Sequence, residues 1–154
     1  MSDPTRYTNF QLDKPPAVGT SEHALWLVHW HFEWENPRQV DMLATLYTDD
    51  IVWELPSAGI SFTGKQSTLD NYRQTFAMLG ELRFDLIERY ATPTRVFDDR
   101  WAYFIVTDIA AFPMPNLTIK EGVPVKMRLV HNFHVRDGLI SRENVFQMIP
   151  PQGV

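Results

Sequence analysis

Two histidines placed among apolar residues are the side chains of this sequence best suited to proton transfer. His31 lies in the run from Ala24 to Trp34, whose length and almost continuous apolar character predict a mostly buried helix. His131 belongs to an alternating pattern that predicts one buried strand face, formed by Met127, Leu129, His131, Phe133 and Val135. Because imidazole changes its charge near neutral pH, both are candidate catalytic residues. The alternative is a structural core histidine satisfied by hydrogen bonds.

Asp108 is the third candidate catalytic residue. It interrupts the apolar run that starts at Tyr103, so we expect a carboxylate within a buried strand. Burial would raise the pKa of this carboxyl group toward that of a working general base. The alternative is an ion pair with Lys126 or Arg128 on the neighbouring strand.

Six further residues are expected to bind substrate. Tyr72 lies on the apolar stripe of a predicted helix, where its hydroxyl group could reach a ligand. Arg73 flanks that stripe, and the alternative for it is a solvated surface charge. The other four are aromatic residues that would form flat apolar walls for an aromatic substrate, namely Tyr103, Trp34, Trp53 and Phe133.

The remaining polar residues of these segments are predicted to face away from the interior. On the helix, His29 diverges from His31 and is expected at solvent or at a subunit interface. On the strands, Asn132, His134 and Glu54 are expected on the outer face. Because neighbouring histidines point in different directions on both elements, no metal site is predicted.

The composition is that of one globular domain. Of the 154 residues, 44% are hydrophobic and 21% are charged, which is sufficient to bury a core. Residues 1–20 show neither the periodicity of a helix nor that of a strand. They are expected to form an extended arm before a single domain of residues 21–154. A formal net charge of −5 without a basic block argues against nucleic acid as a partner. With no cysteine, no leader-like segment and no long apolar run, we expect a cytoplasmic protein that does not enter membranes.

The elements that must position these residues are three helices followed by strands. The spacing predicts helices over 21–34, from Pro37 to about 50, and over 65–79, with Gly80 as the terminating residue. Strands are predicted over 51–55, 82–95, 100–112, 123–136 and 139–148, the last two joined by a tight turn at Asp137-Gly138. This order predicts an α+β fold in which helices pack on a curved, mostly antiparallel sheet that forms a cone.

The segment ALWLVHWHFEWENPRQVDMLATLYTDDIVWELP resembles the opening of the nuclear transport factor 2-like superfamily. This superfamily includes SnoaL-type polyketide cyclases, ketosteroid isomerase, scytalone dehydratase and phenazine biosynthesis proteins A and B. The matching features are Asn36, Asp41, Leu46-Tyr47 and Asp49-Asp50, and the later hairpin HNFHVRDGLI is also similar.

The resemblance implies roles for particular residues. His31 falls where ketosteroid isomerases place the tyrosine that donates to the substrate oxyanion, and His131 where they keep a protonated carboxylic acid. Leu55 falls at the place of their carboxylate base, so steroid isomerisation is not supported. The resemblance also implies a homodimer through the outer face of the sheet, with Asn132, His134 and Arg128 at the interface.

These observations predict a cofactor-independent lyase or isomerase that uses acid–base catalysis on a hydrophobic, aromatic small molecule. The motifs G-x-S-x-G, G-x-G-x-x-G and the phosphate-binding loop do not occur, so serine hydrolysis, dinucleotide redox chemistry and nucleotide hydrolysis have no support. One alternative is an epoxide-opening hydrolase that uses Asp108 with Arg73 or Arg128. Another is a non-catalytic binding or dimerisation module.

Overall fold

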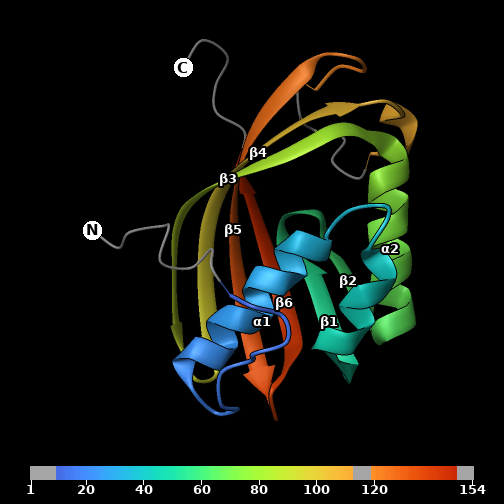
Figure 1. The fold of residues 1–154 in the computed structure, drawn as a ribbon. Coiled ribbons are helices and arrows are strands. Elements are labelled where there is room, and N and C mark those ends of the chain that lie inside the picture. Colours follow the sequence, from blue (N-terminus) through green and yellow to red (C-terminus); the bar gives the residue numbers. More distant parts are fainter. Residues whose placement is uncertain (1–9, 113–118, 149–154) are drawn as a thin grey trace.

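The computed structural model describes residues 10–112 and 119–148, which form helices on a six-stranded sheet (Figure 1). The helices are α1 (Ser21–Trp34), the 3-10 helix η2 (Val40–Leu46) and α2 (Lys65–Met78), with short 3-10 turns η3 (Pro56–Ala58) and η4 (Ile109–Ala111). The strands are β1 (Tyr47–Leu55), β2 (Ile60–Thr63), β3 (Leu79–Thr92), β4 (Arg95–Val106), β5 (Pro124–Arg136) and β6 (Leu139–Met148).

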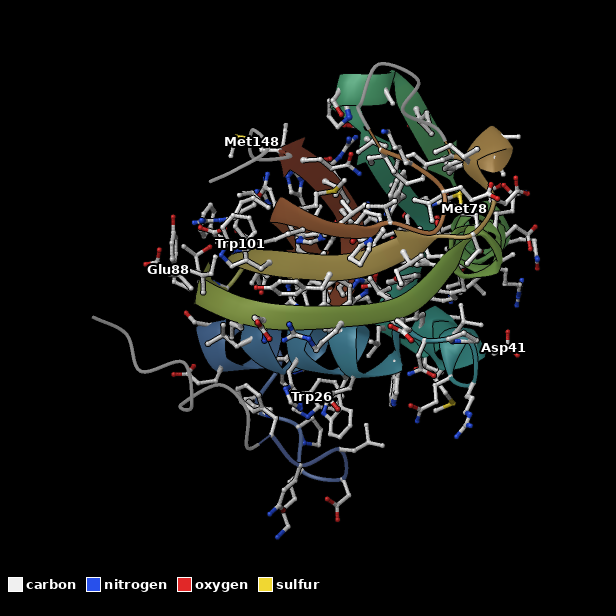
Figure 2. The ribbon with its side chains drawn as sticks, turned by 90° about the horizontal axis from the view of Figure 1, so that it is seen from above. Trp26, Asp41, Met78, Glu88, Trp101 and Met148 are labelled. Carbon is white, nitrogen blue, oxygen red and sulfur yellow. The ribbon has the colours of Figure 1, made fainter. Side chains whose placement is uncertain are left out.

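The sheet confirms the predicted α+β class. Its strand order is β2-β1-β6-β5-β4-β3, and of the described pairs only β1 with β6 runs parallel. The long strands curve around α1 and α2, which lie on the concave side (Figure 1). Figure 2 shows Trp26 on the side of α1 away from the sheet and Trp101 on the opposite, outer side of the sheet. In the described ranges, no helix has both the length and the apolar character needed to cross a bilayer.

Helix α1 is buried on nearly all sides, as its apolar sequence predicts. Thr20 caps its start, because the Thr20 side chain accepts a hydrogen bond from the backbone N–H of His23. Residues 10–20 cover the side of α1 that faces away from the sheet, and the Gln11 carbonyl accepts from the Trp26 indole over 2.9 Å. Under this cover His29 is 9% exposed, so the expectation that His29 faces solvent is wrong.

Two predicted boundaries at the helices are also corrected. The second helix ends at Leu46, and β1 begins at Tyr47 because strand pairing with β6 replaces the helical spacing there. Gly80, expected to end the third helix, already lies in β3, where it pairs with Ile105. The short strand β2, which pairs with the end of β1, was not predicted.

The β3–β4 hairpin turns earlier than the sequence suggests. The Thr92 side chain accepts backbone hydrogen bonds from Thr94 and Arg95, which closes the turn, and β4 begins at Arg95 instead of Arg100. The inward side of the longer strand therefore includes Asp98 and Arg100, both almost fully buried.

Candidate active site

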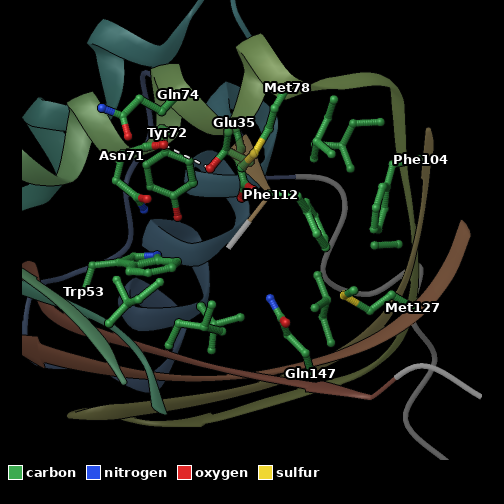
Figure 3. A pocket seen from close by; sticks show the side chains of 18 of the residues that line it. Glu35, Trp53, Asn71, Tyr72, Gln74, Met78, Phe104, Phe112, Met127 and Gln147 are labelled. Atoms are coloured by element: carbon green, nitrogen blue, oxygen red, sulfur yellow. Dashed lines mark hydrogen bonds between the residues drawn. The ribbon is translucent and has the colours of Figure 1, made fainter. Parts of the chain in front are cut away.

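A cavity of about 390 Å³ lies between α2 and the concave face of the sheet. Figure 3 shows Phe104 and Met127 on one side of it, across from Trp53, Asn71 and Tyr72 on the other. Most of the lining is apolar, and its polar members include Glu35, Asn71, Tyr72, His131, Glu143 and Gln147. A mostly apolar cavity with a few converging polar groups is typical of small-molecule binding sites.

Glu143 is the buried carboxylate of this cavity, and the sequence analysis missed it. If the register of the tight turn continued along β6, Glu143 would pair with Asn132 and face outward. A bulge between His134 and Val135 shifts the register by one residue, so Glu143 pairs with Phe133 and points inward. Such a shift moves every following side chain to the other face of the sheet.

Three side chains surround the Glu143 carboxylate, which is 1% exposed. The Tyr72 hydroxyl donates to Oε2 over 2.7 Å, His31 Nε2 lies 3.5 Å from Oε1, and His131 Nε2 lies 4.0 Å from the same oxygen. Burial alone would raise the pKa of Glu143, but the His31 imidazole, helped by His131 and Tyr72, outweighs burial and lowers it. Glu143 is therefore ionised at neutral pH.

His31 is completely buried behind the cavity wall and does not line the cavity itself. Its Nδ1 is 3.0 Å from the Tyr47 hydroxyl, and its Nε2 is 3.3 Å from the Tyr72 hydroxyl and 3.4 Å from Glu35. Burial would lower the pKa of His31, but the carboxylates of Glu143 and Glu35 raise it to about 9. An imidazolium at this place donates from both ring nitrogens and acts on the cavity through Tyr72 and Glu143.

His131 lines the cavity between two acidic groups. Its Nε2 is directed to Glu143, and its Nδ1 lies 3.6 Å from Asp98. Asp98 is fully buried and paired with both Arg89 and Arg100. Burial would raise the pKa of Asp98, but hydrogen bonding to Arg100 and the charges of both arginines lower it far below its usual range. Asp98 is not among the predicted site residues, because it falls before the strand that the sequence predicts over residues 100–112, whereas β4 begins at Arg95.

The sequence matches the model of a known protein family. A family model described as "SnoaL-like domain" matches residues 28–143. The chain belongs to the SnoaL-like family. No curated protein sequence matches it.

Solved structures similar to this SnoaL-like domain share its fold at low sequence identity. A candidate ketosteroid isomerase from Kribbella flavida is 20% identical over 86% of this chain and 85% of its own, with a TM-score of 0.62. An LEH-like epoxide hydrolase from M. tuberculosis is 17% identical over 83% and 84%, with a TM-score of 0.64. A candidate polyketide cyclase from Silicibacter sp. tm1040 is 17% identical over 84% and 91%, with a TM-score of 0.67.

The SnoaL-like domain brings four of the predicted site residues to the cavity. His131, Tyr72 and Trp53 line it and Asp108 lies at its rim, whereas His31 and Phe133 lie directly behind the lining. The Phe133 ring contacts both imidazoles, with centroid distances of 5.1 Å to His31 and 5.7 Å to His131. Leu55, which the resemblance places at the isomerase base, lines the cavity as an apolar residue, and Glu143 on another strand supplies the carboxylate.

Asp108 is placed differently from the prediction. It follows the end of β4, is exposed at the rim of the cavity, and accepts a hydrogen bond from the Ala111 backbone N–H over 3.4 Å. Lys126 and Arg128 pair with β4 further back, opposite Tyr103 and Trp101, so neither meets Asp108. The predicted strand continues only to Val106, and the 3-10 turn η4, capped by the Asp108 side chain, follows it. The sequence also predicts that the proline-containing connection of residues 111–124 is long enough to cover the cavity mouth, with a surface loop as the alternative, and residues 113–118 of it lie outside the described ranges.

Three other predicted ligand contacts lie away from the cavity. Arg73 is exposed and paired with Asp41 and Asp70 on the surface. Trp34 is buried in the core, and Tyr103 lies outside the cavity beneath Arg83. Arg128 is paired with Asp99, so the acid and arginine set of the epoxide-opening alternative is not brought together. In residues 10–112 and 119–148, no group of three histidine or acidic side chains is arranged to hold a metal ion.

Proposed function

We propose that this SnoaL-like domain is a cofactor-independent acid–base enzyme, a lyase or isomerase for a hydrophobic, aromatic small molecule. The observation that carries the proposal is Glu143, an ionised and almost fully buried carboxylate at the lining of an apolar cavity. A base in such surroundings requires little solvent rearrangement when it accepts a proton. Tyr72 donates a hydrogen bond to it over 2.7 Å, and His131 Nε2 lies 4.0 Å from its other oxygen.

In the proposed reaction, Glu143 removes a proton from a substrate carbon next to a carbonyl group. The electron pair of the broken C–H bond forms a C=C bond, and negative charge develops on the carbonyl oxygen. In an isomerase, Glu143 returns the proton to another carbon. In a dehydratase, the carbonyl re-forms, the electron pair of the enolate moves to a C=C bond between the deprotonated carbon and its other neighbour, a hydroxyl group leaves that neighbour, and His131, as general acid, supplies the proton that completes water.

Tyr72 and His31 keep Glu143 in the ionised, hydrogen-bonded form that the proposed reaction needs. Burial, followed by the charge of Glu143, raises the pKa of Tyr72 well above its usual value, so the phenol keeps its proton and acts as a donor. His31 carries the fixed positive charge that holds Glu143 ionised. His31 is therefore a positioning residue that acts through Glu143 and does not touch the substrate.

The proposal is tested by hydrogen–deuterium exchange at carbon. The protein is incubated in D₂O with aryl ketones, β-hydroxy ketones and aryl-propane diols, and mass spectrometry follows deuterium uptake and new products. We expect Glu143→Gln to lower the rate by about a hundredfold or more. The matched control is Glu54→Gln, because Glu54 pairs with Arg142 and does not line the cavity. A Glu143→Gln rate within a few-fold of wild type would contradict the proposal, and binding without exchange or product would favour the binding module.

We also propose that two copies associate through the outer face of the sheet. Arg128, Asn132 and His134 are half-buried on this face of β5. Sedimentation equilibrium is expected to give twice the monomer mass of 17.9 kDa. A monomer at all accessible concentrations would show that this association does not occur.

A further inference from the structure

Unpaired polar atoms are concentrated around the cavity. Eight buried side-chain nitrogen or oxygen atoms of the described residues have no hydrogen-bond partner, and five of them belong to residues that line the cavity: Glu35, Trp53, Asn71, His131 and Gln147. A buried polar group without a partner costs about 1–3 kcal/mol. Their concentration at one place indicates that a ligand supplies the missing partners.

Two of these five atoms already face a charged neighbour. Glu35 Oε2 lies 3.4 Å from His31 Nε2, and His131 Nδ1 lies 3.6 Å from Asp98. The other three have no such neighbour. They are two donors, Trp53 Nε1 and Asn71 Nδ2, and one acceptor, Gln147 Oε1.

The two donors belong to the same side of the cavity as the proposed base. Trp53 is the register partner of Glu143 on the adjacent parallel strand, and both side chains line the cavity. Asn71 directly precedes Tyr72 on α2. Figure 3 shows Trp53, Asn71 and Tyr72 on one wall.

The acceptor lies toward the other side. Gln147 is on the same face of β6 as Glu143 but four residues further along, which separates their backbones by about 13 Å. In Figure 3, Gln147 lies on the floor of the cavity, toward Met127 and away from Asn71. The rest of the lining is mostly apolar and includes the aromatic residues Phe84, Phe104 and Phe112.

We propose that the cavity selects a hydroxyaryl ketone. Trp53 and Asn71 donate hydrogen bonds to the ketone oxygen, and Gln147 accepts a hydrogen bond from the aryl hydroxyl group at the far end. The ring occupies the apolar part of the cavity, which includes Phe84, Phe104 and Phe112. The part of this inference that places the ketone beside Glu143 rests on the proposed function, whereas the two hydrogen-bonding subsites concern binding alone.

Three ligands of the same shape test the proposal on the wild-type protein by titration calorimetry. Para-hydroxybenzylacetone carries both oxygen groups, benzylacetone lacks the hydroxyl group, and para-butylphenol lacks the ketone. We expect each truncated ligand to bind about tenfold more weakly than para-hydroxybenzylacetone. The proposal is wrong if the three bind equally or if para-hydroxybenzylacetone does not bind. This comparison needs no variant.

Variants assign each loss to a subsite. Trp53→Phe is expected to weaken both ketones about five- to tenfold and to leave para-butylphenol unchanged, and Asn71→Leu serves the same purpose if Trp53→Phe does not fold. Gln147→Met is expected to weaken both phenols and to leave benzylacetone unchanged. Circular dichroism of each unliganded variant verifies its fold. Equal weakening of all three ligands by a folded variant would overturn the assignment.

The ligand-binding experiment and the deuterium-exchange experiment can fail independently of each other. If the ligand order and the variant pattern hold while Glu143→Gln does not affect exchange, the subsites are correct and the proposed base is wrong. If exchange depends on Glu143 but the three ligands bind equally, the proposed base stands and the subsites are rejected.

Discussion

Replacing Glu143 with glutamine should change the titration of His31, although the two side chains lie on elements distant in the sequence. In the folded protein the pKa of His31 is raised to about 9 from 6.5, against a burial effect that would lower it. Glu143 is the foremost cause of this increase. Glutamine keeps the shape and removes the charge, so we expect the pKa of His31 to fall from about 9 toward 6.5 or below.

The displacement of the His31 pKa corresponds to about 3 kcal/mol of folding free energy. Because the folded-state pKa lies above the unfolded value, this stability is fully present below about pH 6.5 and is lost as the pH rises through about 9. The pKa of Glu143 is lowered from 4.5, so its contribution is present above that pH and is lost as the pH falls through the folded-state pKa. Both effects describe one ion pair and count once. Stability should therefore be greatest between about pH 4.5 and 6.5.

The assay is a proton NMR titration of the imidazole rings, with the His31 signal assigned through its contact with the Tyr47 ring. Denaturant unfolding at several pH values gives the accompanying free energies. In Glu143→Gln the decrease of the unfolding free energy from pH 6.5 to 9 should largely disappear. Glu54→Gln should leave the pKa of His31 and the pH dependence of the unfolding free energy unchanged. A wild-type His31 that titrates near 6.5, or a Glu143→Gln protein in which His31 still titrates near 9, would refute the coupling.

Four further substitutions test the interactions of Glu143 and Asp98 and the predicted role of Arg73. Tyr72→Phe leaves Glu143 without its 2.7 Å donor and should lower the free energy of unfolding by about 1–3 kcal/mol, measured by urea denaturation. Asp98→Asn leaves two buried arginines uncompensated and should cost about 3–5 kcal/mol, whereas Asp99→Asn, at the partly exposed neighbouring pair, should cost about 1 kcal/mol or less. Arg73→Ala should leave the affinity for para-hydroxybenzylacetone unchanged, because Arg73 does not line the cavity, and a tenfold loss measured by calorimetry would show otherwise.

The fold was accessible from the sequence because periodicity reports burial directly. The apolar run of α1 and the alternation of β5 are set by the same core, and the Asp137-Gly138 turn follows from the positive φ angles that these two residues adopt. Element ends were harder to predict. The charged segment before Arg100 resembles a loop, yet it continues β4 because its acids and arginines neutralise one another.

The site was only partly accessible, for a local reason. His31 and His131 stand out as single polar residues in apolar patterns, and Tyr72 lies on a helical stripe. Glu143 lies in a segment whose inward face depends on a bulge of one residue, and no turn signal in the sequence marks that bulge. A pattern that alternates strictly from the turn places Glu143 outside, so the central carboxylate of the candidate site was missed.

The charges around Glu143 explain how this carboxylate can be ionised in an apolar cavity, as the proposed reaction requires. His31 lies in the last turn of α1, where the helix dipole favours a cation, and this cation meets two carboxylates, Glu143 and Glu35. His31, with His131 and Tyr72, keeps Glu143 ionised although burial opposes it. In the proposed reaction the proton moves to Glu143 and the negative charge moves to the substrate oxygen, so the total buried charge is unchanged and the pair of His31 and Glu35 is kept. The rate of the reaction therefore depends on how well hydrogen-bond donors stabilise the charge at its new position, a role that Trp53 and Asn71 have in the proposed subsite.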